Sequence, residues 1–384
     1  MARKIVRPVT ALDYRRLAEK RLPRFLFDYI DGGASDESTM RANEEDFRAY
    51  RLKQRVMRDV SDVNAETQLI GQAVSMPLVL APIGLAGMMA RRGEALAARA
   101  AQVAGVPFTA STVGICPLEE VRDATIEPFW FQLYMLRDRD LVLSLLERAE
   151  ATGCQTLVFT VDLAVTGMRH RDVRNGMLSN SLAGRLSKVR QILARPRWLL
   201  DVALKGKPHT FGNLREAVSD ANDLDGFKAF IDSQFDPGVT WKDIAWLRSQ
   251  WQGNLLIKGV MTAEDALAAV DSGADGVIVS NHGGRQLDGV ASSISKLPEV
   301  VAALNGRAEV FMDGGVRNGV DVVKALSLGA RGVLIGRPWV WSMAARGEQG
   351  LVDLLEVFRQ EIKATMALMG VCRIADLTPE LIEY

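Results

Sequence analysis

The chain has 384 residues, 48% hydrophobic and 24% charged, and its 47 basic and 47 acidic side chains balance at pH 7. This composition is typical of a globular protein with a large core, and it argues against nucleic acid as a partner. The three cysteines have no metal-type or C-x-x-C spacing, which indicates a reduced protein facing the cytosol.

The N-terminal part of the sequence predicts helices and no membrane-spanning segment. Residues 11–22 and 25–29 carry apolar side chains at helical spacing, and the glycines that follow Asp31 mark a helix end, so residues 1–76 are expected to form a helical N-terminal extension. The basic N-terminus is not followed by the apolar core of a signal peptide. The most apolar run, residues 78–90, is broken by Pro82 and two glycines and is too short to span a bilayer.

Short apolar strands alternate with amphipathic helices over residues 77–372, which is typical of a parallel sheet with helical crossovers. Helices are expected around residues 142–149 and after the capping residue Thr262. The expected strands are 78–81, 107–111, 129–134, 156–162, 255–259, 276–280, 309–313 and 332–336. This pattern predicts an α/β fold, a (β/α)8 TIM barrel with a long insertion at residues 163–240, and a doubly wound sheet is the alternative. The usual dinucleotide, nucleotide and zinc motifs do not occur, so no metal is expected.

Polar side chains follow several of the expected strands. They are Tyr134, Asp162, Lys258, His282 and Arg285. The carboxyl ends of barrel strands meet on one face, so these groups should share one pocket. Each has a structural explanation on its own, such as a helix cap for the aspartate or a packed core position for the histidine. Together they predict an active site.

Two glycine-bearing turns complete this face. Asp313, Gly314, Gly315 and Arg317 follow the seventh expected strand, and Gly336 with Arg337 follows the eighth. Barrels commonly bind a phosphate at these positions through backbone N–H groups and a helix N-terminus. Either turn alone is more often a sign of tight packing, but both together predict a phosphate-bearing cofactor.

The segment from Ser280 to Asp288, SNHGGRQLD, resembles the active-site signature of the FMN-dependent L-2-hydroxy-acid dehydrogenases and oxidases. The resemblance covers almost the whole chain. Further stretches that carry it are 22–29, 131–134, 160–162, 257–259, 313–315 and 335–337. Residues 87–94, 116–120 and 167–176 are most similar to the bacterial respiratory L-lactate dehydrogenases within this family.

The resemblance implies that FMN lies across the mouth of the barrel. Its phosphate would bind at Gly315, Arg317, Gly336 and Arg337, and Lys258 would favour a negatively charged reduced flavin. The full set of expected cofactor residues is Ala81, Pro82, Ile83, Ser111, Gln132, Thr160, Lys258, Ser280, Asp313, Gly314, Gly315, Arg317, Gly336 and Arg337.

The resemblance also implies how a 2-hydroxy acid binds. Arg285 would hold its carboxylate with help from Tyr29 and Arg169, and Tyr134 would hydrogen-bond its hydroxyl. His282 would act as the base, with Asp162 stabilising the imidazolium. The sequence leaves open whether a hydride or an α-proton is transferred.

The reaction implied is oxidation of L-lactate to pyruvate, with electrons passed to a quinone or a cytochrome. Val113 stands where plant glycolate oxidases carry tryptophan, and Gly84 stands where oxidases tend to carry alanine, which favours a dehydrogenase. The alternatives are another L-2-hydroxy acid such as mandelate or glycolate, an oxidase that uses O2, and a flavin-binding barrel that serves as a membrane-bound sensor. The family resemblance also suggests a homotetramer.

The insertion is unusually basic. Residues 169–209 hold ten Lys or Arg and two Asp, and Leu182, Leu186, Val189 and Leu193 lie at near-helical spacing. One interpretation is a solvated lid over the active site. The other is contact with an anionic membrane surface, supported by similar insertions in membrane-associated relatives. That would place the protein peripherally on the cytoplasmic side of the inner membrane rather than free in the cytoplasm.

Overall fold

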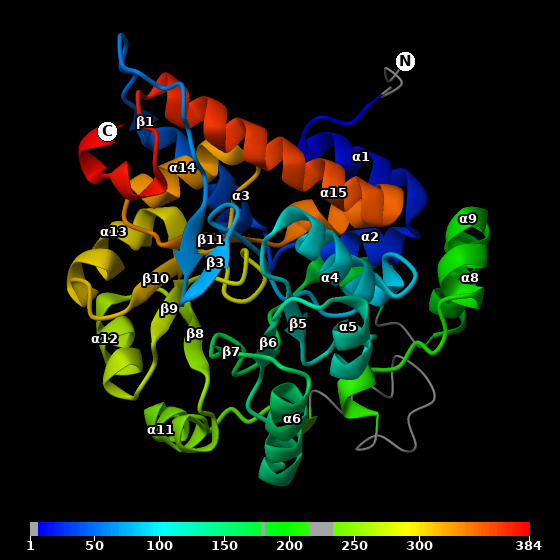
Figure 1. The fold of residues 1–384 in the computed structure, drawn as a ribbon. Coiled ribbons are helices and arrows are strands. Elements are labelled where there is room, and N and C mark those ends of the chain that lie inside the picture. Colours follow the sequence, from blue (N-terminus) through cyan, green and yellow to red (C-terminus); the bar gives the residue numbers. More distant parts are fainter. Residues whose placement is uncertain (1–6, 178–180, 216–232) are drawn as a thin grey trace.

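The computed structural model describes residues 7–177, 181–215 and 233–384. Eight parallel strands form one sheet in the order β4-β11-β10-β9-β8-β7-β6-β5. A bridge between Leu80 and Phe108 joins the two edges of this sheet, so it curves into an almost continuous barrel (Figure 1). The strands are β4 (Leu78–Leu80), β5 (Thr109–Ser111), β6 (Trp130–Leu133), β7 (Thr156–Thr160), β8 (Asn254–Val260), β9 (Gly276–Val279), β10 (Glu309–Met312) and β11 (Gly332–Ile335). The predicted (β/α)8 barrel is confirmed.

A helix follows each barrel strand and packs on its outside. Thr262 caps one of them by accepting a hydrogen bond from the Asp265 N–H at 3.1 Å, and the apolar stripe of residues 142–149 is buried, both as the sequence predicts. The outer helices are α4 (Gly93–Ala104), α5 (Leu118–Ala124), α6 (Arg139–Ala151), α11 (Trp241–Gln250), α12 (Ala263–Asp271), α13 (Ser293–Leu304), α14 (Gly319–Ser327) and α15 (Arg337–Leu368).

Large side chains fill the interior of the barrel. Trp130 and Phe311 meet edge to face with ring centroids 5.8 Å apart, and Leu256 and Ile278 pack in the same buried cluster. The hairpin of β2 (Thr67–Leu69) and β3 (Gln72–Val74) adds two residues to this cluster. It therefore closes the amino-terminal end of the barrel and leaves the carboxyl end for the site.

The N-terminal extension is helical only in its first half. Helices α1 (Ala11–Arg21), α2 (Arg24–Asp31) and α3 (Ser38–Glu45) and the 3-10 turn η1 (Asp46–Ala49) are followed by short strands, where the sequence predicts a mainly helical extension. The first of these, β1 (Arg51–Leu52), pairs with β12 (Ile382–Glu383) near the C-terminus. Local helical periodicity does not encode this pairing of β1 with a distant segment, whereas β2 and β3 pair with each other as a hairpin.

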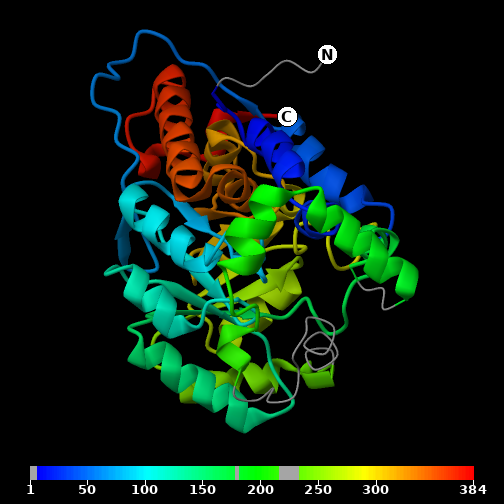
Figure 2. The ribbon, with the colours of Figure 1, turned by 90° about the vertical axis from the view of Figure 1, so that its right-hand side faces the viewer.

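The insertion between β7 and α11 forms a separate layer at the edge of the barrel mouth. It contains α7 (His170–Arg174), α8 (Leu182–Leu193), α9 (Pro196–Trp198) and the helical turns η3 (Leu199–Leu204) and η4 (Gly212–Leu214). Figure 2 shows these segments, in green, in front of the strands and beside the N-terminal helices. Within the described ranges, no helix combines the length and apolarity needed to cross a membrane.

Candidate functional site

A cavity of about 630 Å³ opens at the carboxyl ends of the barrel strands. Nearly all of the predicted site residues line it. The exceptions are Gln132, Asp162 and Ser280, and each of these hydrogen-bonds a residue that does. The structure therefore brings together residues predicted from many separate strand ends.

His282 and Asp162 form a buried pair at the end of this cavity. The His282 Nδ1 lies 2.8 Å from the Asp162 Oδ1. Burial lowers the pKa of His282, and the positive charge of Lys258 lowers it further, although the carboxylate opposes this. Burial alone would raise the pKa of Asp162, but His282 and Lys258 outweigh that effect and the pKa is lowered. At neutral pH an ionised carboxylate only accepts hydrogen bonds, so Nδ1 carries the proton and Nε2 keeps a lone pair for a substrate proton.

The backbone of the histidine is also constrained. His282 has a φ of +58°, and the two glycines that follow have φ of +63° and +72°. Its N–H donates to the Ser280 Oγ at 3.1 Å. A non-glycine residue in the left-handed region is uncommon, and strain of this kind is typical of functional sites.

Lys258 supplies a fixed positive charge near the pair. Its Nζ lies 3.2 Å from the Asp313 Oδ2 and donates to the Ser280 Oγ at 2.9 Å. Burial would lower the pKa of Lys258, but Asp313 and Asp162 reverse this and raise it. The ammonium is therefore protonated throughout the physiological range.

Two arginines meet at one backbone carbonyl beside the cavity. Arg285 donates from Nη1 to the Gly32 oxygen at 2.8 Å, and its guanidinium lies over the Tyr29 ring at 5.2 Å. Arg337 donates to the same oxygen at 2.8 Å and to the carbonyls of Asp31 and Gly283. Burial lowers the pKa of Arg285 to about 10, so it stays charged and is available to an anion. The side chain of Arg337 instead donates to backbone carbonyls of the segments around Gly32 and Gly283.

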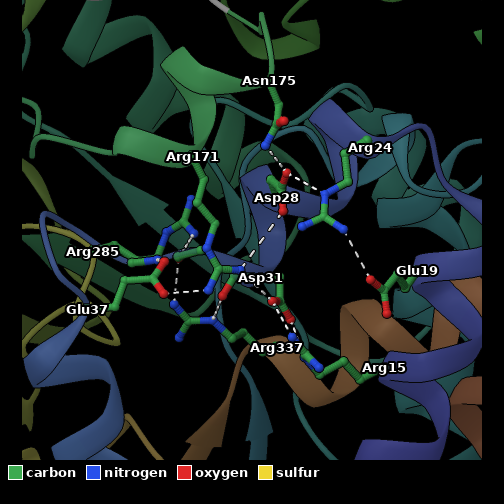
Figure 3. A network of polar contacts seen from close by, with 12 residues as sticks. Arg15, Glu19, Arg24, Asp28, Asp31, Glu37, Arg171, Asn175, Arg285 and Arg337 are labelled. Atoms are coloured by element: carbon green, nitrogen blue, oxygen red, sulfur yellow. Dashed lines mark hydrogen bonds and ion pairs between the residues drawn. The ribbon is translucent and has the colours of Figure 1, made fainter. Parts of the chain in front are cut away.

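The side chain of Asp31 holds this corner together from behind. Its carboxylate accepts from the Arg15 Nε at 2.6 Å and Nη2 at 2.7 Å, and from the Arg171 Nη1 at 3.0 Å. Figure 3 shows these groups joining α1, α2 and the insertion around the two site arginines. Arg171 also pairs with Glu37. The N-terminal extension and the insertion are thus clamped to each other at the mouth of the cavity.

Several buried polar atoms near the cavity have no partner within the described chain. They include the Thr160 Oγ1, the Gln132 Nε2 and the Asp313 Oδ1. An unpaired buried polar atom costs about 1–3 kcal/mol, so these positions fit a ligand with many hydrogen-bonding groups. The flavin ring of FMN has such groups along its edge, and Ala81, Pro82 and Ile83 line the cavity as an uncharged wall for a ring.

The opposite end of the cavity fits a phosphate. Gly314 and Gly315 have φ of +93° and +85°, and Gly336 precedes the first turn of α15 without a side-chain cap. Backbone N–H groups at such a turn and helix N-terminus bind anions. Arg317 lies here with its Nη2 2.6 Å from Glu44 and its Nε buried and unpaired among the described residues. The residues present therefore fit FMN at both ends.

The remaining predicted substrate residues, Tyr134 and Arg169, also line the cavity. Tyr134 lines the cavity, and burial followed by the charge of Asp162 raises the pKa of its hydroxyl, which therefore stays protonated and can donate. The Arg169 Nη2 lies 3.3 Å from the Gln286 side chain. A Cβ on Gly84 would lie 2.7 Å from the Val113 Cγ2, so glycine allows this close contact.

The structure adds site residues that sequence reasoning missed. Asn43 and Asn281 exchange side-chain hydrogen bonds at 2.8 and 2.9 Å, and the Asp288 carboxylate accepts from the Thr39 N–H at 2.8 Å. These contacts fix the histidine loop on α3. Asp172 is buried against the cavity near Arg285, Arg169 and Arg171, and burial raises its pKa. The only sequence feature that could have pointed to Asp172 is that it is one of two acidic residues in the basic segment 169–209.

Comparisons with known proteins agree on one family. The family model described as FMN-dependent dehydrogenase matches residues 18–384. The L-lactate dehydrogenase of Caulobacter vibrioides is 51% identical over 370 residues, 96% of each chain, and that of Pectobacterium atrosepticum is 48% identical over 368 residues, 96% of this chain and 95% of the relative. Among solved structures, the monotopic membrane protein (S)-mandelate dehydrogenase superposes with a TM-score of 0.92 at 37% identity, covering 98% of this chain and 99% of the other.

Proposed function

This chain belongs to the FMN-dependent dehydrogenase family, and from that premise we propose that it oxidises L-lactate to pyruvate with FMN as its bound cofactor. The observation that carries the proposal is the neutral His282, paired with Asp162 at 2.8 Å, in the same cavity as the charged Arg285. A base and a carboxylate-binding cation in one cavity suit a 2-hydroxy acid. The bound FMN supplies the acceptor for two electrons.

The substrate is oriented by its carboxylate. Arg285 offers a planar, charged donor that matches a carboxylate, with Arg169 and Tyr29 on the same side of the cavity. The Tyr134 hydroxyl donates to the substrate hydroxyl oxygen. Fixing both the carboxylate and the hydroxyl oxygen leaves one face of the substrate toward the reacting groups, so we expect the enzyme to select one enantiomer.

His282 then takes a proton from the substrate at Nε2. The imidazolium that forms is stabilised by Asp162, which keeps its negative charge because its pKa is lowered. Lys258 holds a positive charge at the same end of the cavity and stabilises negative charge that develops there. These roles are the same whether the α-carbon loses its hydrogen as a hydride or as a proton.

We propose that the electrons pass to a quinone or a cytochrome. We also propose that the protein attaches to an anionic membrane surface. Along α8, Leu182 and Leu193 are 86% and 64% exposed, and Arg185, Lys188 and Arg190 lie on the same helix. An exposed apolar helix face with a basic flank suits the surface of an anionic bilayer. The monotopic mandelate dehydrogenase, of the same fold, supports this reading.

Membrane attachment is tested by sedimentation with vesicles. Wild-type holoenzyme should pellet with vesicles that contain anionic lipid, and replacing Leu182 and Leu193 by serine should release it. A double variant at exposed apolar positions of two other helices, Val103→Ser on α4 with Leu368→Ser on α15, controls for loss of surface apolarity. Binding that is unchanged in the α8 variant would contradict the membrane proposal.

The assembly and location are further parts of the proposal. A homotetramer on the cytoplasmic side of the inner membrane is supported by the family resemblance, and residues 1–384 are taken as one domain with a barrel at 77–372. Light scattering of the purified holoenzyme measures the oligomeric state. A monomer or dimer would contradict the tetramer without affecting the reaction.

The reaction is tested by an anaerobic absorbance spectrum of the purified holoenzyme. L-Lactate should bleach the oxidised flavin, whereas D-lactate should not. Faster bleaching by mandelate or glycolate would identify another L-2-hydroxy acid as the substrate, and rapid reoxidation by air would identify an oxidase. A His282→Ala variant that keeps full turnover would favour a non-catalytic flavin-binding sensor.

A further inference from the structure

Asp172 is a buried carboxylate in the cavity that takes no part in the proposed reaction. Its residue is 5% exposed. Basic residues outnumber acidic ones among the described residues that line the cavity, and the acidic ones are Asp172 and Asp313. The Asp313 carboxylate pairs with the Lys258 Nζ at 3.2 Å. Asp172 is therefore the acid whose charge acts on the basic groups of the insertion side.

The charge of Asp172 acts on the two arginines that are expected to bind the substrate carboxylate. Burial raises the pKa of Asp172, and the positive charges that oppose this most strongly are those of Arg285 and Arg169. Asp172 in turn opposes the lowering of the Arg285 pKa by burial. Arg171 also lies nearby, but its Nη1 pairs with Asp31 at 3.0 Å. The two arginines and Asp172 together carry one net positive charge.

Hydrogen bonds of the backbone fix the acid relative to both arginines. The Asp172 N–H donates to the Arg169 carbonyl at 3.2 Å, at the start of α7, and the Asp172 carbonyl accepts from the Met177 N–H at 3.0 Å. The Arg169 Nε donates to the Arg285 carbonyl at 3.4 Å. The three charged groups thus belong to one connected piece of structure rather than to independent loops.

A buried site is most stable when its charges balance. One carboxylate of a bound substrate neutralises the single net positive charge of Arg285, Arg169 and Asp172. A second carboxylate would bring an excess negative charge into the cavity that already holds the Asp172 charge. Without Asp172 the two arginines would carry two positive charges, and a dianion would neutralise them.

We propose that Asp172 makes the site selective for 2-hydroxy acids with one carboxylate and against those with two, such as L-malate. The inference rests on the proposed function, because it assumes that Arg285 and Arg169 hold the substrate carboxylate. Asp172 takes no proton from the substrate. It determines specificity through its charge.

The proposal is tested by anaerobic flavin bleaching of the holoenzyme with L-lactate and with L-malate at low concentration, which gives a second-order rate constant for each. The variants are Asp172→Asn, which removes the charge and nearly keeps the shape, and Asp172→Glu, which keeps the charge. The ratio of the two rate constants is the readout, because a purely structural defect lowers both rate constants together.

We expect Asp172→Asn to raise the ratio of the malate to the lactate rate constant by about tenfold or more, the scale of one unit charge inside a buried site. Asp172→Glu should leave this ratio within about threefold of the wild type. An unchanged ratio in Asp172→Asn, or an equal loss of both rate constants, would overturn the proposal. Comparable rate constants for the two acids in the wild-type enzyme would overturn it without any variant.

Equilibrium binding tests the same selectivity without turnover. The oxidised holoenzyme is titrated with propionate, which has one carboxylate, and with oxalate, which has two, and the change in flavin absorbance is followed. Asp172→Asn should tighten oxalate binding about tenfold more than propionate binding. Equal effects on both anions would overturn the proposal. A wild-type flavin that L-lactate does not bleach would refute the proposed function, whereas the charge selectivity of anion binding would still be measured by this titration.

Discussion

Replacing Asp162 by asparagine removes the negative charge that faces the base. The two side chains lie 2.8 Å apart, and Lys258 adds a positive charge that disfavours the imidazolium. Charge centres about 4 Å apart at an effective dielectric constant near 20 interact by about 4 kcal/mol. Each ~1.4 kcal/mol corresponds to tenfold in rate, so we expect flavin bleaching by L-lactate to slow by about 10³-fold.

The assay is anaerobic stopped-flow absorbance at saturating L-lactate. Asp162 does not line the cavity, so the half-saturating lactate concentration should change by less than about threefold. Asp271→Asn, which breaks an exposed ion pair with Arg307, is the matched control and should leave the rate unchanged. An Asp162→Asn enzyme that binds FMN normally and bleaches at the wild-type rate would refute a role for this carboxylate in stabilising the imidazolium. A change in the half-saturating lactate concentration alone would instead assign Asp162 to substrate binding.

Three further outcomes are expected. Since burial lowers the pKa of His282 below its usual 6.5 and the reaction needs the neutral form, the acid-side fall of kcat/KM should begin only below about pH 6.5, and an acid-side midpoint above that value in a pH–rate profile would contradict this. Gly315→Ala should abolish FMN retention because its Cβ would lie 1.8 Å from a backbone oxygen, whereas Gly306→Ala, with a similar positive φ and open space, should retain FMN in a gel-filtration and absorbance test. Asp31→Asn, which leaves two arginines without their carboxylate, should lower the free energy of unfolding by about 3 kcal/mol, and an unchanged urea midpoint would contradict that estimate.

The barrel and the residues at its strand ends were predictable because both follow from local patterns. Apolar runs of strand length alternate with amphipathic helices, and parallel strands bring their carboxyl ends to one face, so Asp162, Lys258 and His282 had to converge. The strand boundaries differ by one or two residues, which does not move these side chains.

What the sequence could not predict depends on contacts between distant segments. The hydrogen bonds between Asn43 and Asn281 join residues 238 apart, and no spacing rule relates them. Nothing in the sequence indicated that the guanidinium of Arg337 donates to the carbonyls of Asp31, Gly32 and Gly283, and the assignment of Arg337 to the phosphate stays a prediction. Which of several arginines binds a ligand and which shapes the loop depends on the backbone that each one meets.

The attachment of the histidine loop to α3 also sets the order in which the site forms. Asp288 accepts from the N–H groups of Ser38 and Thr39, about 250 residues earlier in the chain. Closing so long a loop carries a large entropy cost that only a folded barrel can offset. Helix α3 therefore leaves the ribosome early, but it can contact the histidine loop only after three quarters of the chain has been made.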